Sequence, residues 1–160
     1  MSETELQPAA APFCCFIEGS QGFDAGGLQA DIAIGRFAAS PDGSHRLVRL
    51  GPDQWLYLTA ANAAQPNLPK GAAIFEQSEM RAWFTLSGGL AEAALSSLGP
   101  RDLRLPAFPE GAGGRARLGP MTVILLRTGP AAFLIGAPVS FAHYAGDMLT
   151  AALKTAQADV

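Results

Sequence analysis

The stretch WFTLSGGLAEAALSSLG, residues 83–99, carries a strand, a tight corner and a short helix. Together with the residues just before it, its first part alternates between two faces, which is the period of a half-buried strand. Its second part repeats apolar residues at helical spacing and stops at Gly99-Pro100, a typical helix end. The Ser-Gly-Gly corner between the two could hold a phosphate or could only turn the backbone.

The glycine pair of this corner, Gly88-Gly89, has the strand before it and the helix after it that a phosphate loop requires. The remaining parts of such a loop are missing, because the sequence has no G-x-G-x-x-G, no G-x-x-x-x-G-K-[ST] and no lysine nearby to meet a phosphate. Adjacent glycines at a strand-to-helix corner more often allow a tight turn and close packing. We therefore predict a structural corner.

The composition limits the classes of function. The chain has 160 residues, 49% of them hydrophobic and 16% charged, which suits one domain with one core. Its 11 Lys and Arg against 14 Asp and Glu give a net charge of -3, without the basic excess that nucleic-acid binding requires. So few charges indicate either a surface of small residues or a surface that a partner covers.

The N-terminal segment MSETELQPAAAP has no basic region of a signal peptide, and no apolar run reaches the ~18 residues of a membrane span. We therefore predict a cytoplasmic protein. Residues 1–12 show no period and are predicted to be a disordered lead-in, followed by a single domain over residues 13–156. Cys14 and Cys15 are adjacent, cannot form a CxxC pair, and are predicted to be buried free thiols.

Two predicted hairpins share a sequence motif. RLGPDQWLYL, from Arg49, and RTGPAAFLIG, from Arg127, both read Arg-x-Gly-Pro-x-x-aromatic-Leu. Each predicts a strand, a turn and a strand. An internal duplication and a chance match both explain the shared letters, since Gly-Pro is a common turn dipeptide, and we favour the duplication.

The C-terminal segment predicts a helix with Ser140 as its N-cap. Its apolar face consists of Phe141, Ala145, Met148, Leu149 and Ala152. Its opposite face, which we expect in solvent, consists of His143, Asp147, Thr150 and Lys154. The elements together predict an α+β fold in which helices pack on one face of a mixed or antiparallel sheet.

A search of the sequence for chemistry finds no complete site. His45 and His143 are the only histidines, and His143 with Asp147 makes half of a metal site or a surface pair. FTLSGG is not a nucleophile elbow, and no base accompanies the cysteines. Single carboxylates stay open as proton-transfer groups, namely Asp24, Asp31 and Asp102. We predict no catalytic, cofactor-binding or metal-binding residue.

Arg115 and Arg117 follow the flexible glycines of PEGAGGRARLGP. They could belong to an anion-binding or docking loop, or they could be alternate residues on the exposed face of a strand. We favour the strand, because paired Arg residues are common on such faces. Both remain candidate partner-interface residues, since Arg is also typical of interfaces.

The order of these motifs resembles a known family. RLGPDQWLYL, RAWFTLSGGLAEAAL and DLRLPAFPEGAGGRARLGPMTVILLRTGPAAFLIGAPVSFAHYAGDML are similar, in order and spacing, to the gamma subunit of heterotetrameric sarcosine oxidase. The likeness spans residues 46–153, and its motifs are diagnostic only in combination.

The resemblance implies a domain similar to the folate-binding aminomethyltransferase fold, reduced to a non-catalytic subunit that assembles and stabilises the complex. It implies alpha, beta and delta subunits as partners, with neither nucleic acid nor membrane. Those subunits, and not this chain, would carry FAD, FMN, NAD, tetrahydrofolate and zinc. The complex would demethylate sarcosine oxidatively and pass the one-carbon unit to tetrahydrofolate.

One departure from the family leaves alternatives open. Where members have a helix after the first hairpin, residues 61–70 contain Pro66 and Pro69, which leave no room for one. The chain could therefore serve a related N-methyl amine dehydrogenase. It could also be a small folate-binding protein with a buried carboxylate in a central cleft, or a free-standing homo-oligomer.

Overall fold

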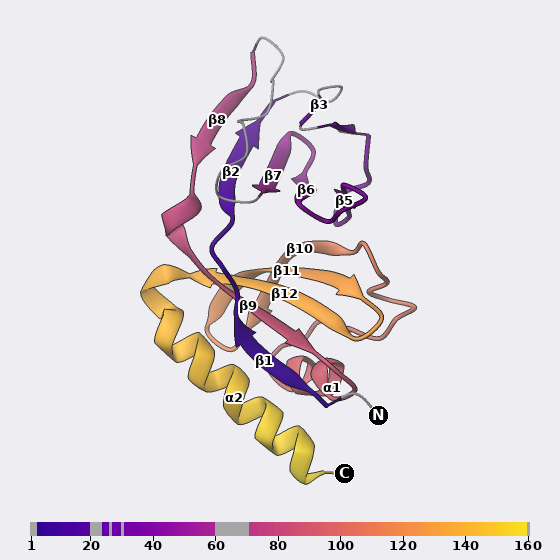
Figure 1. Ribbon diagram of the computed structural model, residues 1–160, viewed down its shortest axis with the longest axis vertical. Coiled ribbons are helices and arrows are strands. Elements are labelled where there is room, and N and C mark those ends of the chain that lie inside the picture. The colour runs from indigo at the N-terminus through magenta and orange to yellow at the C-terminus, as the bar shows by residue number, and fades with distance from the viewer. Residues whose placement is uncertain (1–2, 20–23, 26, 30, 60–70, 160) are drawn as a thin grey trace. The chain divides into compact units, whose positions relative to one another are not determined.

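The computed structural model describes residues 3–19, 24–25, 27–29, 31–59 and 71–159. The chain divides into two compact units (Figure 1), which are described separately. Unit 1 consists of Met1–Ala10 and Met80–Val160, and unit 2 of Ala11–Glu79. Each unit has a five-stranded sheet of its own, and the single domain over residues 13–156 stays a prediction.

Unit 1 is a five-stranded antiparallel sheet with two α-helices. Its strand order is β1-β9-β12-β11-β10, and the strands are β1 (Glu5–Pro8), β9 (Arg81–Ser87), β10 (Gly113–Leu118), β11 (Met121–Gly129) and β12 (Ala132–Pro138). The helical elements are η1 (Ser78–Met80), which leads from unit 2 into β9, α1 (Ala91–Ser96), η2 (Val139–Phe141) and α2 (Ala142–Ala158).

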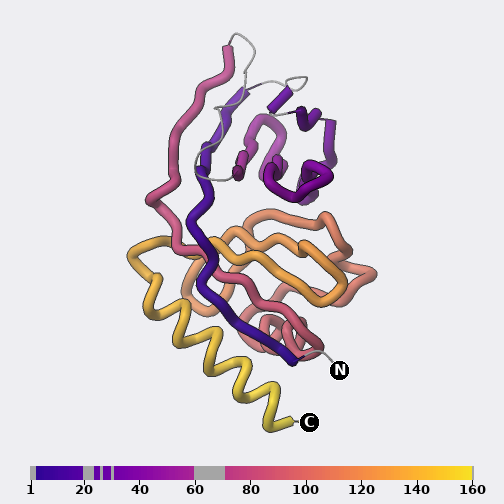
Figure 2. The backbone as a smooth tube through the Cα atoms, in the orientation of Figure 1, coloured from indigo at the N-terminus to yellow at the C-terminus, as the bar shows by residue number. Residues whose placement is uncertain are grey.

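Both α-helices of unit 1 pack on one face of this sheet, as Figure 2 shows. Leu95 of α1 and Leu149 of α2 share one buried cluster with Leu86, Leu125 and Phe133 of the strands. The predicted α+β fold, with helices on one face of an antiparallel sheet, is confirmed for this unit. The strand and helix predicted from residues 83–99 correspond to β9 and α1.

The predicted lead-in over residues 1–12 is wrong for residues 5–8. Glu5–Pro8 forms β1, which pairs antiparallel with β9, and the Ala9 N–H donates to the Trp83 carbonyl at 2.8 Å. The segment has no strand period of its own, so the pairing with β9 determines its conformation. Pro8 at the end of an edge strand removes a donor where loss is tolerated.

The start of α2 also differs from the prediction. Phe141 is the N-cap residue and makes no side-chain cap bond, while Ser140 lies inside η2. Phe141 is 43% exposed rather than part of the buried face. The inward face consists of Ala145, Leu149 and Ala152, as predicted. The predicted polar face is exposed at all four positions, His143, Asp147, Thr150 and Lys154.

Unit 2 is a second five-stranded antiparallel sheet. Its order is β5-β6-β7-β2-β8, and the strands are β2 (Phe13–Glu18), β5 (Phe37–Ala39), β6 (His45–Gly51), β7 (Gln54–Thr59) and β8 (Ala73–Glu76). A two-stranded ribbon is formed by β3 (Asp24–Ala25) and β4 (Leu28–Gln29). Cys14 and Cys15 are free and buried in β2, as predicted. The Pro66 and Pro69 segment lies outside the described residues.

The two hairpins with shared lettering have the same geometry. In β6-β7 the register shifts between Arg49 and Gly51, and in β11-β12 it shifts between Arg127 and Gly129. Each is a β-bulge at the same place relative to the Gly-Pro turn. In both hairpins the Arg side chain stacks over the aromatic residue six positions later, at 5.0 Å for Arg49 and 4.6 Å for Arg127.

The duplication divides the chain into two halves, β1 to β7 and β8 to β12. The likeness between these halves extends to the strands that precede the hairpins. The Gly19 N–H, after β2, donates to the Asp53 carbonyl at 3.1 Å, and the Gly88 N–H, after β9, donates to the Ala131 carbonyl at 2.9 Å. Each acceptor is the residue after the Gly-Pro pair of its hairpin. The structure therefore supports an internal duplication, in which Gly88 corresponds to Gly19.

The first strand of each half pairs with a strand of the other half. β1 precedes β2 in the chain but pairs with β9, whereas β8 precedes β9 but pairs with β2. Each half thus contributes one edge strand to the sheet of the other, which is why unit 1 contains the N-terminal residues.

A substitution of Gly88 tests how tightly the corner after β9 packs against Thr4. Its φ is 114°, and a Cβ there would lie 2.4 Å from the Thr4 Cα. Gly88→Ala is expected to lower the free energy of unfolding by about 3 kcal/mol, through backbone strain and overpacking. Denaturant unfolding followed by tryptophan fluorescence measures the change.

Two glycines serve as controls for that variant. A Cβ at Gly89 meets nothing within 4 Å, so Gly89→Ala should change stability by less than about 1 kcal/mol. Gly19 has no positive φ, and a Cβ there would lie 2.9 Å from the Ala72 Cβ and 3.1 Å from the Ala72 Cα, so Gly19→Ala should fall between the two. Equal losses at Gly88 and Gly89 would contradict this account of the corner.

Candidate functional site

The Gly88-Gly89 corner is filled by the chain itself. The backbone of Thr4 lies against Gly88, and the Leu90 N–H donates to the Thr4 Oγ1 at 2.9 Å. The Gly88 N–H is also taken, by the Ala131 carbonyl. A phosphate loop needs such N–H groups for the anion. The geometry therefore supports the predicted structural corner.

Arg127 is the buried charged residue of unit 1. Its side chain is 0% exposed and donates from Nη2 to Glu92 Oε2 on α1 at 2.5 Å, while its guanidinium lies over Phe133. Its Nε and Nη1 have no hydrogen-bond partner among the described residues. The sequence marked Arg127 only as part of the repeated hairpin, and its pairing with Glu92 needs the tertiary contact between α1 and β11.

The Arg127–Glu92 pair gives a stability prediction. Glu92→Gln removes the anion from a fully buried guanidinium, so the free energy of unfolding should fall by about 2 kcal/mol, discounted because Glu92 is partly exposed. Arg127→Met replaces the cation by a side chain of similar length and should cost less. Thermal and urea unfolding compare the variants. A larger loss for Arg127→Met would show that stacking on Phe133 outweighs the charge pair.

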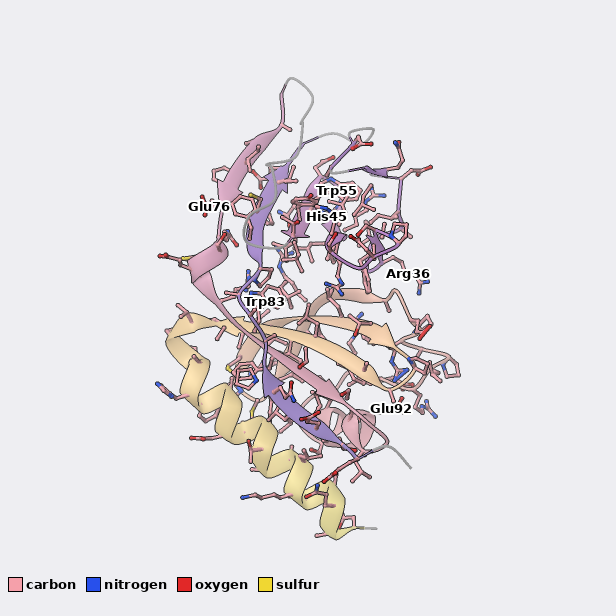
Figure 3. The ribbon with its side chains drawn as sticks, in the orientation of Figure 1. Arg36, His45, Trp55, Glu76, Trp83 and Glu92 are labelled. Atoms are coloured by element: carbon pink, nitrogen blue, oxygen red, sulfur yellow. The ribbon has the colours of Figure 1, made fainter. Side chains whose placement is uncertain are left out.

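Unit 2 contains a polar cluster at the end of β6 and β7 (Figure 3, His45). The His45 Nδ1 lies 2.8 Å from the Tyr57 hydroxyl and 2.8 Å from the Thr59 Oγ1. Tyr57 is fully buried, and burial is the largest cause that raises the pKa of its hydroxyl. Burial likewise raises the pKa of the Cys15 thiol, with a further rise from Glu76. Both groups are therefore held in their neutral forms.

This cluster was not foreseen from the sequence. The three polar residues fall at the ends of two paired strands, where His45 lies opposite Thr59 in the register. The alternation of β6 and β7 predicts the strands but not which side chains meet. Since Tyr57 and Cys15 are neutral and buried, the cluster links the two strands and supplies no thiolate or phenolate nucleophile.

The three carboxylates that stayed open in the sequence are not brought together. Asp24 accepts hydrogen bonds from the Gly27 N–H at 2.7 Å and from Gln29 at 3.4 Å, and so caps the β3-β4 turn. Asp31 is exposed. Asp102 lies in unit 1 and accepts from Arg104, with 3.0 Å from Nε to Oδ1 and 2.6 Å from Nη2 to Oδ2. None of the three has a second carboxylate partner for general acid–base work.

The Arg104 hydrogen bonds lower the pKa of Asp102 from 3.8 to about 2. Because the folded pKa is depressed, the stabilisation from the ion pair is present above about pH 4 and is lost as pH falls through about 2. Asp102→Asn should therefore reduce stability slightly at neutral pH, and this loss should shrink as pH falls toward 2 and vanish well below it. A carboxyl-carbon NMR titration and acid unfolding of both proteins measure this. A normal titration of Asp102 would contradict the pairing.

Metal binding finds no support in the described parts of the chain, where no group of three or more His, Cys, Asp or Glu side chains could hold an ion. His143 and Asp147 both lie on the exposed face of α2. Of the two alternatives for this pair, a position on the surface fits the structure.

Arg115 and Arg117 lie on the exposed face of β10, where they alternate with the buried Ala116 and Leu118. The strand interpretation of these residues is therefore correct. The free edge of β10 is covered by its own chain, since the Arg101 Nη1 donates to the Arg115 carbonyl at 2.9 Å. The role of Arg115 and Arg117 in a partner interface stays a prediction.

Besides Ile34 and Leu105, large apolar side chains stand exposed in two groups that the sequence patterns did not reveal. In unit 1 they surround the start of α2, namely Met80, Val139, Phe141 and Tyr144. In unit 2 they lie on β8, namely Ile74 and Phe75. Exposed clusters of this kind are typical of interaction surfaces. The sequence feature that could have revealed these exposed side chains is that they are apolar residues outside the helical or strand period.

One hollow of about 760 Å³ in unit 2 lies around the β6-β7 turn and carries two carboxylates, Glu18 and Asp53. Both are exposed, and no aromatic residue lines the hollow. Among the described residues, the buried polar or charged side chains are those of Thr59 and Arg127. The described parts of the chain therefore contain no buried carboxylate of the kind that a pterin site requires.

Solved structures with a similar fold include a sarcosine oxidase chain and an aminomethyltransferase. A chain of the heterotetrameric sarcosine oxidase from Corynebacterium sp. U-96, in complex with pyrrole 2-carboxylate, matches with a TM-score of 0.81 at 20% identity, over 95% of this chain and 84% of that chain. The glycine cleavage system aminomethyltransferase T from Bartonella henselae matches with a TM-score of 0.62 at 15% identity, over 91% of this chain and 45% of that chain. The chain has the aminomethyltransferase fold.

The predicted likeness to this fold is thus confirmed, although the chain spans under half of the aminomethyltransferase. No family model matches the sequence, and no curated protein is significantly similar to it. None of the described helices is both long and apolar enough to cross a membrane.

Proposed function

We propose that this protein is a non-catalytic subunit of an amine-oxidising complex of the sarcosine oxidase type, and that it acts in the assembly and stability of that complex. The observation that carries the proposal is the match, over 95% of this chain, to 84% of a chain in a heterotetrameric enzyme. The two chains are therefore of comparable length, and this chain corresponds to nearly the whole of one of its chains.

The order of sequence motifs supports the same assignment. RLGP, LSGG and RTGP resemble the gamma subunit, and each of them forms a structural feature here: a bulged hairpin, a packed corner and a second bulged hairpin. In this chain, these motifs determine the course of the backbone. A family recognised by such motifs is one whose members share a scaffold.

The chemistry of the described residues also favours a subunit without catalysis. The buried cation Arg127 is engaged with Glu92 and Phe133, and the buried Tyr57 and Cys15 are held neutral. We therefore assign FAD, FMN, NAD, tetrahydrofolate and zinc to partner chains, with alpha, beta and delta subunits as the partners and the cytoplasm as the location. Sarcosine is the proposed substrate of the complex, and another N-methyl amine is the alternative.

A small folate-binding protein is the second candidate, because the aminomethyltransferase match is to a one-carbon enzyme of the same fold. The described carboxylates weigh against it, since none of them is buried.

Co-purification tests the first candidate. The tagged chain, expressed in its native host, should bring down several chains in equal amounts, with the visible absorbance of flavin in the eluate. The purified complex should consume oxygen when sarcosine is added, and oxidation of a different N-methyl amine would identify the alternative substrate. Elution of the chain alone and without flavin would refute the subunit assignment.

A folate titration separates the second candidate from the first. The isolated chain, titrated with tetrahydrofolate by calorimetry under anaerobic conditions, is expected to show no saturable heat. Saturable binding in a chain that recruits no partner would favour the folate-binding protein.

A further inference from the structure

Strand β8 lies at the edge of the unit 2 sheet and is exposed at every position. Its sequence is AIFE, from Ala73 to Glu76, and β2 is its neighbour in the strand order. Figure 1 shows β8 alongside β2, at the outside of that sheet. An edge strand of this kind offers unpaired backbone groups to another strand.

The backbone of β8 points alternately toward β2 and away from it. The Gln77 N–H donates to the Cys14 carbonyl at 2.7 Å, so Gln77 faces β2. Inward and outward main-chain groups alternate in an antiparallel ladder. The main-chain N–H of Phe75 therefore also points toward β2, and the N–H groups of Ile74 and Glu76 point outward. Two outward donors are thus available for a further strand.

The β10 edge of unit 1 is protected, in contrast to β8. There the Gly119 N–H donates to the Leu98 carbonyl at 2.7 Å, and Arg101 donates to the Arg115 carbonyl. A Cβ at Gly99 would lie 2.1 Å from the Arg117 carbonyl, so the chain runs directly against this edge. The chain therefore covers the β10 edge with its own backbone, whereas β8 is exposed at all four positions and its outward N–H groups have no partner among the described residues.

The side chains of β8 indicate what would bind there. Ile74 is 38% and Phe75 50% exposed, and the Phe75 ring contacts Phe16 at a centroid distance of 6.5 Å. Toward the end of the strand stand Glu76 and Glu79, which have no Lys or Arg within ion-pair distance among the described residues. A hollow of about 210 Å³ lies between these two carboxylates and residues 11–13.

We infer that β8 accepts an extended segment of a partner subunit as an added strand. The segment would carry an apolar side chain next to Phe75 and a Lys or Arg facing Glu76 and Glu79, because unpaired carboxylates beside an apolar edge are complementary to such a sequence. This inference rests on the proposed function, and it names the surface through which the subunit joins its complex.

The test uses the complex co-purified from the native host with three variants of the tagged chain. Ile74→Pro removes an outward N–H and leaves the β2 ladder intact, a position where proline is tolerated. Glu79→Lys reverses a charge that has no hydrogen bond or ion pair described. Leu105→Ser, an exposed apolar residue of unit 1 that lies outside both apolar clusters, is the matched control. Circular dichroism and melting curves confirm that each variant folds as the unchanged protein does.

Ile74→Pro and Glu79→Lys are each expected to reduce the recovered partner chain by about tenfold, whereas Leu105→Ser leaves it unchanged. In addition, a photoreactive amino acid in place of Phe75 should cross-link to a partner segment that contains Lys or Arg.

Three results would overturn the inference. Full recovery of the partner with both β8 variants would leave the subunit assignment intact and reject β8 as the docking strand. A cross-link from position 75 to a second copy of this chain would replace the partner subunit by a homodimer. Elution of the unchanged protein alone would reject the proposed function, and the inference with it.

Discussion

The bulged hairpin of unit 1 is the constraint on which the rest of that unit depends. At the bulge, the Arg127 N–H donates to the Ala112 carbonyl and the Arg127 carbonyl accepts from Gly111, which joins the entry to β10 to the hairpin. The same guanidinium reaches Glu92 of α1 and lies over Phe133. One residue thus connects both strands of the hairpin, the loop before β10 and the first helix. A fully buried cation is costly, so it must be paired, and its pairing sets where α1 lies.

The second hairpin has the same sequence motif as the first, but its Arg has different hydrogen-bond partners. Arg49 stacks over Trp55 as Arg127 stacks over Phe133, but its guanidinium donates to the carbonyls of Ile32 and Pro52, at 2.9 and 3.1 Å. In unit 2 the backbone carbonyls satisfy the cation, and in unit 1 a carboxylate does. The duplicated element therefore conserves the bulge and the stacking, while each half finds its own hydrogen-bond partners.

The proposed role in assembly is compatible with the way this protein is built. Its recurring motifs determine corners and turns, and the buried Arg127 is paired with Glu92 within unit 1. Among the described residues, the solvent-facing features include two apolar clusters and the exposed edge strand β8, which are typical of interfaces. A low content of charged side chains is also compatible with an interface, since a surface that a partner covers needs few of them.

The sequence by itself determined the local elements and the absence of a phosphate motif. The alternation before Ser87, the Gly pair and the repeated Arg-x-Gly-Pro lettering predict β9, the corner and both hairpins, because these depend on neighbours within a few residues. Only the tertiary structure decided that residues 5–8 form a strand, that Thr4 fills the Gly88 corner and that His45 meets Tyr57 and Thr59. Ser140 failed as an N-cap because a 3₁₀ turn precedes α2, which the helical period does not reveal. These outcomes depend on contacts between segments far apart in the chain, and periodicity carries no information about which distant strand supplies the missing partner.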